Sequence, residues 1–210
     1  IVKFVNNTVL KIDGQINAIG NTNDKIKFTS ASANPQNGDW GHIVLTDKSN
    51  DAIITNGAYV SGSIFNNCIF EYGGGLSKGI IAIENSFHYL KNCIIRNSSS
   101  DGVNIQSGSI HIDTSQIYNN TKNGLFLNSL PTKNIQIVNN SIYNNSGGGL
   151  EFDGYLSSFK YTIQKNSINN NNGTGGIHFD NTQDATLIIE ENDIFNNSAN
   201  KGGAFYCRGG

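Results

Sequence analysis

A short cassette recurs along this chain at nearly constant spacing. Each copy begins with Asn or Ser, has any residue second and Ile third, and is usually followed closely by further asparagines. The six copies are Asn67-Cys68-Ile69, Asn92-Cys93-Ile94, Ser115-Gln116-Ile117, Asn140-Ser141-Ile142, Asn166-Ser167-Ile168 and Asn192-Asp193-Ile194. Subtracting residue numbers places successive isoleucines 23 to 26 residues apart. A period in this range is typical of a stacked-repeat architecture, in which each repeat packs on its neighbours.

Each period contains three short apolar runs. The first holds the cassette isoleucine, the second opens with glycine, and the third is a short alternating segment. Apolar and polar residues alternate in Val103-Asn104-Ile105 and in Ile177-His178-Phe179, which is the pattern of a strand with one buried face. No long window shows the apolar period of a helix. The sequence therefore predicts an all-β fold, a right-handed single-stranded parallel β-helix with three short strands per rung of about 25 residues.

The repeat organises the whole chain as one β-helix domain over residues 1–210. Residues 1–66 fit the same plan less regularly, and residues 67–210 form the regular rungs. Both ends look cut within the pattern, so we expect a segment of a longer protein. Asparagines recur at one turn position, and we expect them to stack into a hydrogen-bonded ladder. These asparagines are Asn119, Asn144, Asn170 and Asn196.

The charge balance excludes some partners. The chain has 14 Lys and Arg against 16 Asp and Glu, and no basic cluster of the kind that nucleic acid requires. Its apolar runs are only a few residues long, so we expect no membrane insertion by this segment. Two of the three cysteines, Cys68 and Cys93, share one repeat position and should lie about 4.8 Å apart on neighbouring rungs. A disulfide is sterically conceivable at that separation, but we expect free thiols.

The chain resembles right-handed β-helix repeat proteins of the pectin-lyase-like type. The resemblance begins with Val2-Lys3-Phe4 and continues through Leu10-Lys11-Ile12-Asp13-Gly14, Ile26-Lys27-Phe28-Thr29-Ser30, Trp40-Gly41-His42-Ile43 and Asn67-Cys68-Ile69-Phe70-Glu71-Tyr72-Gly73-Gly74. It implies a part of a large secreted or surface-anchored microbial protein, and hence an extracellular or cell-surface location. The last rung, Phe195-Asn196-Asn197-Ser198 with Gly202-Gly203-Ala204-Phe205, also resembles the repeats of polymorphic outer-membrane adhesins. It departs from their pattern because Ser198 stands where that motif has Asn.

Related β-helix proteins include polysaccharide lyases and glycosidases, which use clustered carboxylates with Arg or Lys. This chain has few such groups. Glu151 with Asp153 or Asp180 could form a carboxylate pair, but we interpret them as a solvated outer face. His88 and His111 recur on adjacent rungs without a third metal ligand. We therefore expect no cofactor; calcium is conceivable, but there is no clear site for it.

An aromatic column is the strongest sign of a binding surface. If each cassette isoleucine points inward, the next residue points outward, and these residues include Phe70, Tyr118, Tyr143 and Phe195. Such a column suits the apolar faces of sugar rings, although it could equally be cross-rung stacking that stabilises the sheet. His178 should lie one rung above Glu151, where the two could clamp a ligand.

These features together predict a non-catalytic, extracellular β-helix module of a larger, adhesin-like protein. Its candidate glycan-binding residues are Tyr118, Tyr143, Phe70, Phe195, Glu151 and His178. Its expected partner is a polysaccharide or a host or neighbour cell-surface glycan. Two alternatives remain: a polysaccharide lyase or glycoside hydrolase, and a structural stalk or filament subunit. Unpaired strand edges at the terminal rungs also predict end-to-end self-association.

Overall fold

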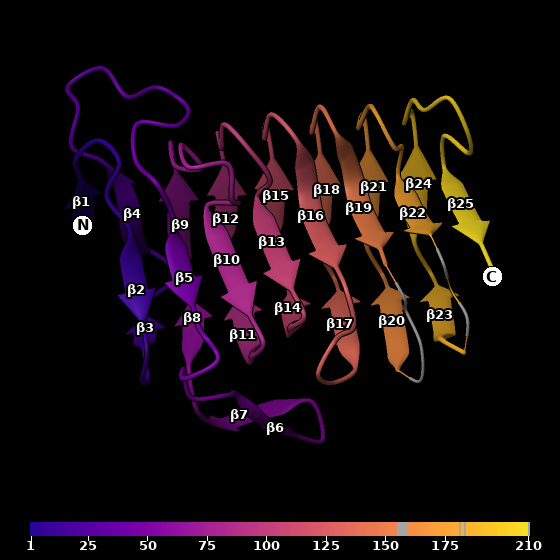
Figure 1. The fold of residues 1–210 in the computed structure, drawn as a ribbon, viewed down its shortest axis with the longest axis horizontal. Coiled ribbons are helices and arrows are strands. Elements are labelled where there is room, and N and C mark those ends of the chain that lie inside the picture. Colours follow the sequence, from indigo (N-terminus) through magenta and orange to yellow (C-terminus); the bar gives the residue numbers. More distant parts are fainter. Residues whose placement is uncertain (155–158, 181, 183, 210) are drawn as a thin grey trace.

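The computed structural model describes residues 1–154, 159–180, 182 and 184–209. These residues form 25 strands and no helix. The strands make three parallel sheets that wind around one axis, together with one small hairpin (Figure 1). The predicted all-β solenoid with three strands per rung is confirmed.

The three sheets, called A, B and C below, each take one strand from successive rungs. Sheet A contains β1 (Val2–Phe4), β4 (Ile26–Ser30), β9 (Cys68–Glu71), β12 (Ile94–Arg96), β15 (Gln116–Tyr118), β18 (Ser141–Tyr143), β21 (Ser167–Asn169) and β24 (Asp193–Phe195). Sheet B contains β2 (Leu10–Ile12), β5 (Ile43–Leu45), β10 (Ile81–Glu84), β13 (Val103–Gln106), β16 (Asn123–Asn128), β19 (Gly148–Asp153), β22 (Ile177–Asp180) and β25 (Phe205–Arg208). Sheet C contains β3 (Asn17–Ile19), β8 (Ile64–Asn66), β11 (Phe87–Lys91), β14 (Ser109–Asp113), β17 (Ile135–Val138), β20 (Lys160–Gln164) and β23 (Thr186–Glu190).

A hairpin interrupts the rungs near the N-terminal end. β6 (Ile53–Thr55) and β7 (Ala58–Ser61) pair in antiparallel fashion and project away from the solenoid (Figure 1). Asn56 and Gly57 both have positive φ, as the tight turn of a two-residue hairpin requires. Ile54 and Tyr59 pack on a small apolar cluster that includes Phe87 and Tyr89 of sheet C. The hairpin is therefore anchored to one outer face of the solenoid.

The core is a continuous apolar column built by inward-pointing side chains. Ile117, Ile142 and Ile168 stack in register on sheet A and are fully buried. Leu125, Leu150 and Ile177 do the same on sheet B, and Ile112, Ile137 and Ile163 on sheet C. Because no single rung can bury its own apolar face, stability comes from stacking on neighbours.

Two ladders of buried side chains run through the corners on either side of sheet A. In one, Asn145 donates through its amide to Asn171 Oδ1 at 3.0 Å and to Ile117 O at 3.1 Å. Its members are Asn120, Asn145, Asn171 and Asn197. In the other, the amides of Asn140, Asn166 and Asn192 are linked in the same way, and the backbone nitrogen of Ser115 donates to Asn140 Oδ1. The amides of these ladders also donate to buried backbone carbonyls beside the corners.

The predicted ladder was wrong by one residue. Asn119, Asn144, Asn170 and Asn196 have φ between 54° and 56°. They are exposed and provide the left-handed backbone conformation that Asn tolerates. In each Asn-Asn pair the first asparagine forms the turn and the second belongs to the ladder. Because both recur with the same period, the period alone does not show which of the two is the ladder member.

Candidate functional site

The outer face of sheet B carries one column of chemically varied side chains that runs along the solenoid axis. The register aligns Asn104 with Phe126, Phe126 with Glu151, Glu151 with His178 and His178 with Tyr206. Their inward neighbours, such as Leu125 and Leu127, are fully buried, so the column faces outward by alternation. We call this column the sheet B strip.

Glu151 occupies the middle of the strip and is half-buried. Burial raises the pKa of its carboxyl, a contact with the Asn123 amide works against this, and the charges of Asp101, Asp153 and Asp180 raise the pKa further. The predicted placement of His178 one rung above Glu151 is what the register shows. The imidazole of His178 stacks on the ring of Tyr206, with centroids 4.7 Å apart. Within the described residues, its buried Nδ1 has no hydrogen-bond partner.

Phe126 is a surface aromatic that the sequence analysis missed. It lies between two inward leucines and is half-buried on the outer face, between Asn104 and Glu151. Among the described residues no other aromatic ring stacks on it. The alternation in Leu125-Phe126-Leu127 was the signal that could have identified it, because the two leucines are inward and the residue between them must face outward.

Tyr118 and Tyr143 lie on sheet A, on a different face from the strip. Their rings stack face to face with centroids 4.7 Å apart and planes 6° apart. The phenol oxygen of Tyr118 accepts a hydrogen bond from Arg96 Nη1 at 2.9 Å. The ring faces between the two tyrosines are therefore occupied, and a flat sugar ring would meet mainly their edges.

An ionic network continues the Tyr118 column toward the N-terminal end. Glu71 Oε2 accepts from Arg96 at 2.6 Å and 2.9 Å, and Lys27 lies 3.3 Å from Glu71 Oε1. Thr29 Oγ1 donates to the same Oε1 at 3.0 Å. Burial works to raise the pKa of Glu71, but the hydrogen bonds from Arg96 and Thr29 and the charges of Arg96 and Lys27 outweigh it and lower that pKa.

The expectation that Phe70 belongs to the outward aromatic column was wrong. Phe70 is fully buried and stacks on Phe28 with centroids 5.0 Å apart. The register aligns Phe70 with Ile95, and Ile95 with Ile117, so in the first two cassettes the residue after the isoleucine points inward. Phe195 lies on the outer face of sheet A at its C-terminal edge, separated from Tyr143 by Asn169. The six candidate residues thus fall in three places: the core, sheet A and sheet B.

His88 and His111, which the sequence places on adjacent rungs, are not aligned with each other. The register aligns His88 with Ile110 and His111 with Tyr89. The two histidines are therefore one residue out of phase and point to opposite faces of sheet C. His88 is buried in contact with the hydroxyls of Ser49 and Ser86, and burial lowers its pKa to about 4.

Comparison with known proteins agrees with this architecture. A family model described as the right handed beta helix region matches the chain twice, over residues 1–157 and 53–210. The chain belongs to the right-handed β-helix family. No match was found among curated proteins or among solved structures.

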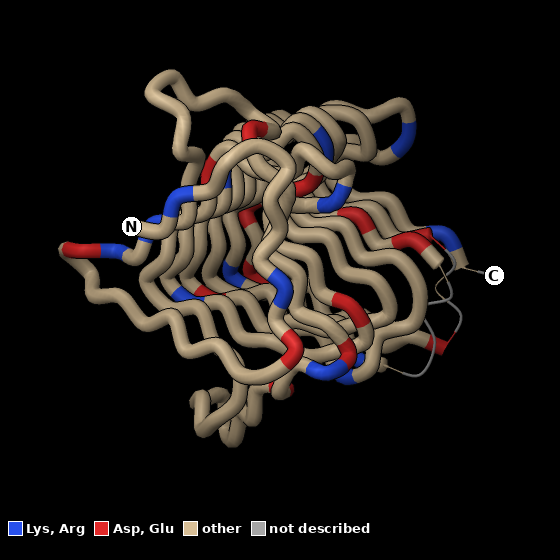
Figure 2. Tube along the Cα trace, turned by 60° about the vertical axis from the view of Figure 1, so that its left-hand side comes forward, with Lys and Arg blue, Asp and Glu red and all other residues tan. Residues whose placement is uncertain are grey.

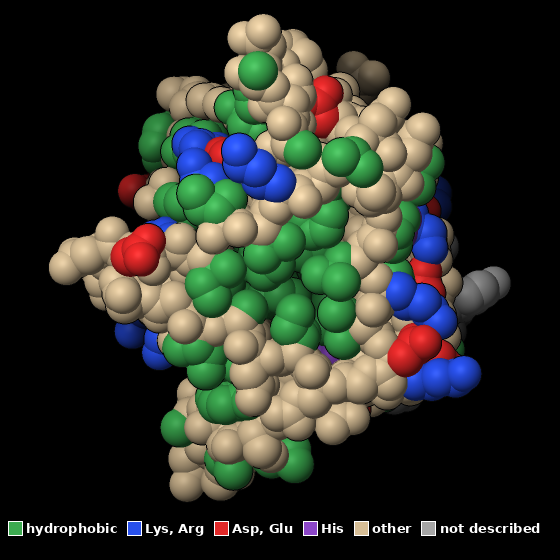
Figure 3. All heavy atoms as spheres, turned by 90° about the vertical axis from the view of Figure 1, so that its left-hand side faces the viewer, with side chains coloured by type: hydrophobic (Ala, Val, Ile, Leu, Met, Phe, Trp, Pro, Cys, Tyr) green, Lys and Arg blue, Asp and Glu red, His purple; other side chains and the backbone are tan. Residues whose placement is uncertain are grey.

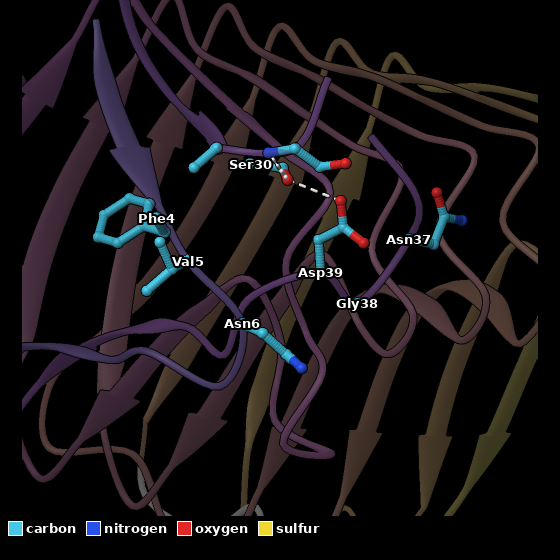
Figure 4. A pocket seen from close by; sticks show the side chains of 9 residues that line it. Phe4, Val5, Asn6, Ser30, Asn37, Gly38 and Asp39 are labelled. Atoms are coloured by element: carbon cyan, nitrogen blue, oxygen red, sulfur yellow. Dashed lines mark hydrogen bonds between the residues drawn. The ribbon is translucent and has the colours of Figure 1, made fainter. Parts of the chain in front are cut away.

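A cavity of about 460 Å³ lies at the N-terminal end of the β-helix (Figure 4). Phe4, Ser30 and Asp39 are among its lining residues. Asp39 Oδ2 accepts hydrogen bonds from Ser30 Oγ at 2.6 Å and from the Gln36 backbone nitrogen at 3.0 Å. These bonds tie the loop over residues 31–39 to the end of β4, so the carboxylate of this cavity fixes a loop.

Charged residues of both signs are scattered along the β-helix (Figure 2). In the described part of the chain, no three His, Cys, Asp or Glu side chains are grouped so that they could hold a metal ion. The same part contains no helix that could cross a membrane.

Proposed function

We propose that this β-helix is a non-catalytic module of a larger surface or secreted protein and that it binds an extended, neutral polysaccharide along the sheet B strip. The observation that supports this most is the in-register column Phe126–Glu151–His178–Tyr206. Rungs repeat about every 4.8 Å. A polymer lying parallel to the axis would therefore meet a new side chain of the strip at each rung.

The side chains of the strip suit sugar chemistry. Carboxylate, amide and imidazole groups can each hydrogen-bond hydroxyls, and the unstacked ring of Phe126 offers a flat apolar surface. Carboxylates outnumber cations on this face. The guanidinium of Arg208 is already engaged there, because it forms a two-point ion pair with Asp180, at 2.5 Å and 2.8 Å. A neutral polysaccharide fits this balance better than a polyuronate, which would need a bridging cation such as calcium.

We favour binding over hydrolysis because one of the carboxylates that the sequence pairs with Glu151 is engaged in an ion pair. Glycosidases need two carboxyl groups free to act on one glycosidic bond. Asp180 is held by Arg208, whereas Glu151 is half-buried with a raised pKa. The ion pair thus engages Asp180, one of the two partners that the sequence suggested for Glu151; Asp153 is the other, and the assay for released oligosaccharides described below tests it.

The Tyr118 and Tyr143 face of sheet A is a second candidate surface for the same ligand. It offers tyrosine ring edges beside Arg96 and the hydroxyl of Ser141. Variants can distinguish the two binding faces, because Phe126 and the two tyrosines lie on different sheets.

The test is a glycan-array screen with and without calcium, followed by titration of the best glycan against variants. We expect Phe126→Ala to weaken binding about tenfold or more, equivalent to ~1.4 kcal/mol, while the matched pair Tyr118→Ala/Tyr143→Ala leaves it nearly unchanged. The reverse result would move the site to sheet A. Absence of saturable binding to any glycan would reject the binding proposal and favour a stalk or filament role.

The same titrations also test for catalysis. Release of shortened or unsaturated oligosaccharides by the wild-type chain, lost in Glu151→Gln, would show a lyase or hydrolase and overturn the non-catalytic assignment. Thermal melts of each variant confirm that it is folded.

A further inference from the structure

Two cysteines lie directly opposite each other on neighbouring rungs. The register aligns Ile69 with Ile94, and one residue earlier it brings Cys68, the first residue of β9, opposite Cys93, which directly precedes β12. Residues paired in this way on adjacent parallel strands have Cα atoms about 4.8 Å apart. Disulfides join Cα atoms separated by about 4.4–6.8 Å. The backbone therefore already meets the spacing requirement for a disulfide.

Both thiols point into the same corner of the solenoid. Cys68 Sγ lies 3.3 Å from Ala18 O, and Cys93 Sγ lies 3.5 Å from Phe65 O. Each carbonyl belongs to sheet C of the preceding rung. Asn140 and Asn166 donate to the equivalent carbonyls of Ile112 and Ile137 in later rungs. The cysteines thus replace the first two members of a buried ladder, with side chains oriented alike.

We propose that Cys68 and Cys93 are an oxidative modification site, at which hydrogen peroxide converts the two thiols into a disulfide linking two rungs. The Cys68 thiolate attacks one peroxide oxygen, which breaks the O–O bond and gives a sulfenic acid and, after protonation, one water. The Cys93 thiol then attacks the sulfenic sulfur, the S–S bond forms, and the hydroxyl leaves as a second water. Two thiols are oxidised and one peroxide is reduced, so the atoms and electrons balance.

The environment of the two thiols indicates which one reacts first and favours a small oxidant. A hydrogen bond from the Cys93 thiol lowers the pKa of Cys68, whereas burial raises the pKa of Cys93 well above its usual value. Cys68 is therefore the better first nucleophile, because the thiolate is the reactive form. A cavity of about 180 Å³ is lined by Lys25, Asn92 and Cys93 among others, so it reaches the second cysteine of the pair. Both sulfurs are almost fully buried, which favours a small oxidant over a bulky disulfide.

The expected consequence is a more stable solenoid. The link closes a loop of 25 residues, by subtraction of the two residue numbers. Closing such a loop restricts the unfolded chain, and for a protein of this size we expect the melting temperature to rise on the order of 5–10 °C. The rungs around β9 and β12 would gain most.

The experiment uses the full chain with Cys207→Ser, because Cys207 is exposed and could link two molecules. The protein is treated with hydrogen peroxide, unfolded, and alkylated before and after reduction. We expect both remaining thiols to disappear together, the intact mass to fall by two hydrogens, and a peptide pair joined through Cys68 and Cys93 to appear. A reductant should restore both thiols and reverse the rise in melting temperature.

Two further variants separate cross-linking from simple oxidation. In the same background, Cys93→Ser should accumulate a sulfenic or sulfinic acid at Cys68 without a gain in melting temperature, and Cys68→Ser should react more slowly. Two alkylatable thiols remaining after peroxide treatment of the folded chain would overturn the proposal. So would over-oxidation of Cys68 while Cys93 stays free.

Discussion

At the scale of single residues, Glu71 is a buried carboxylate whose charge stabilises the fold. Its side chain is 4% exposed and is held by Arg96, Lys27 and Thr29. We expect Glu71→Gln to lower the free energy of unfolding near neutral pH by about 2–3 kcal/mol, because Arg96 loses its charged partner. The lowered pKa of Glu71 means that this contribution is present above the unfolded pKa of about 4.3. It is lost as the pH falls through the folded pKa.

Urea unfolding of wild type and Glu71→Gln at several pH values measures this difference. The two stability curves should converge toward acid. If the difference in unfolding free energy between the two proteins stayed constant across the pH range, the loss would come from packing of the side chain and not from its charge.

Glu151 should behave in the opposite way, which makes it a matched comparison on another face. Burial raises its pKa, so the folded state binds the proton more tightly than the unfolded state does. Its ionised form therefore opposes folding, and stability rises as the pH falls through the folded pKa. We expect Glu151→Gln to leave stability unchanged or slightly higher near neutral pH, measured by the same urea titrations. A clear loss of stability would mean that the carboxylate is held by a favourable contact.

At the scale of elements, the corner ladder is the part of the repeat whose loss should be most costly. Asn145 is fully buried and donates to both Asn171 Oδ1 and Ile117 O. We expect Asn145→Ala to lower the free energy of unfolding by about 2–3 kcal/mol, because the backbone nitrogen and the amide of the buried Asn120 both lose their acceptor, Asn145 Oδ1. The matched control is Asn144→Gly, one residue earlier, where φ is 56°. Glycine adopts this conformation without strain, so little change is expected in chemical denaturation. Equal losses for both variants would contradict a special role of the ladder.

The same elements show why sequence predicted the fold better than the faces of its strands. Three alternating runs per period were enough to identify the sheets, because a buried face imposes alternation on every rung. Which residues face inward was predictable from Ile117 onward, because the cassette isoleucine is followed there by Tyr or Asn, except in the last strand, where Phe195 follows Ile194. This prediction failed at Cys68-Ile69-Phe70 and Cys93-Ile94-Ile95, because in each run both sets of alternate residues are apolar and either set could face inward. There Phe70 and Ile95 enter the core while Ile69 and Ile94 stay half-exposed.

The candidate site was predictable only where it depended on the register of regular rungs. Glu151 and His178 follow glycines at matched positions, so their pairing could be counted from the sequence. The stacking geometry of Tyr118 on Tyr143 could not be counted in this way, because the repeat period predicts which side chains are neighbours but not their rotamers. The ion pair that holds Asp180 depends on Arg208, one rung away, which alternation alone does not identify.

At the scale of the whole molecule, both ends of the solenoid present the same type of surface. β1, β2 and β3 form one edge of the three sheets, and β24, β25 and β23 form the other. Hydrophobic side chains gather in the middle of the N-terminal end (Figure 3). Val5 and Ile19 at that end are 63% and 55% exposed, and Phe205 at the opposite end is 41% exposed. Because successive rungs pair in parallel, one end is complementary to the other and not to itself.

The chain as it stands should therefore associate end to end, in a head-to-tail manner that does not close. We expect the mass measured by light scattering after size-exclusion chromatography to rise with concentration, without a defined dimer as the final state. Phe205→Lys should suppress this rise, because Phe205 is aligned with the inward Ile177 and a charge there would be buried at the joint without a partner. Val60→Lys is the matched control, since Val60 is 59% exposed on the projecting hairpin and not at an end. If Val60→Lys suppressed association as strongly as Phe205→Lys, the contact would involve the sides of the solenoid, and the open edges would not be the cause.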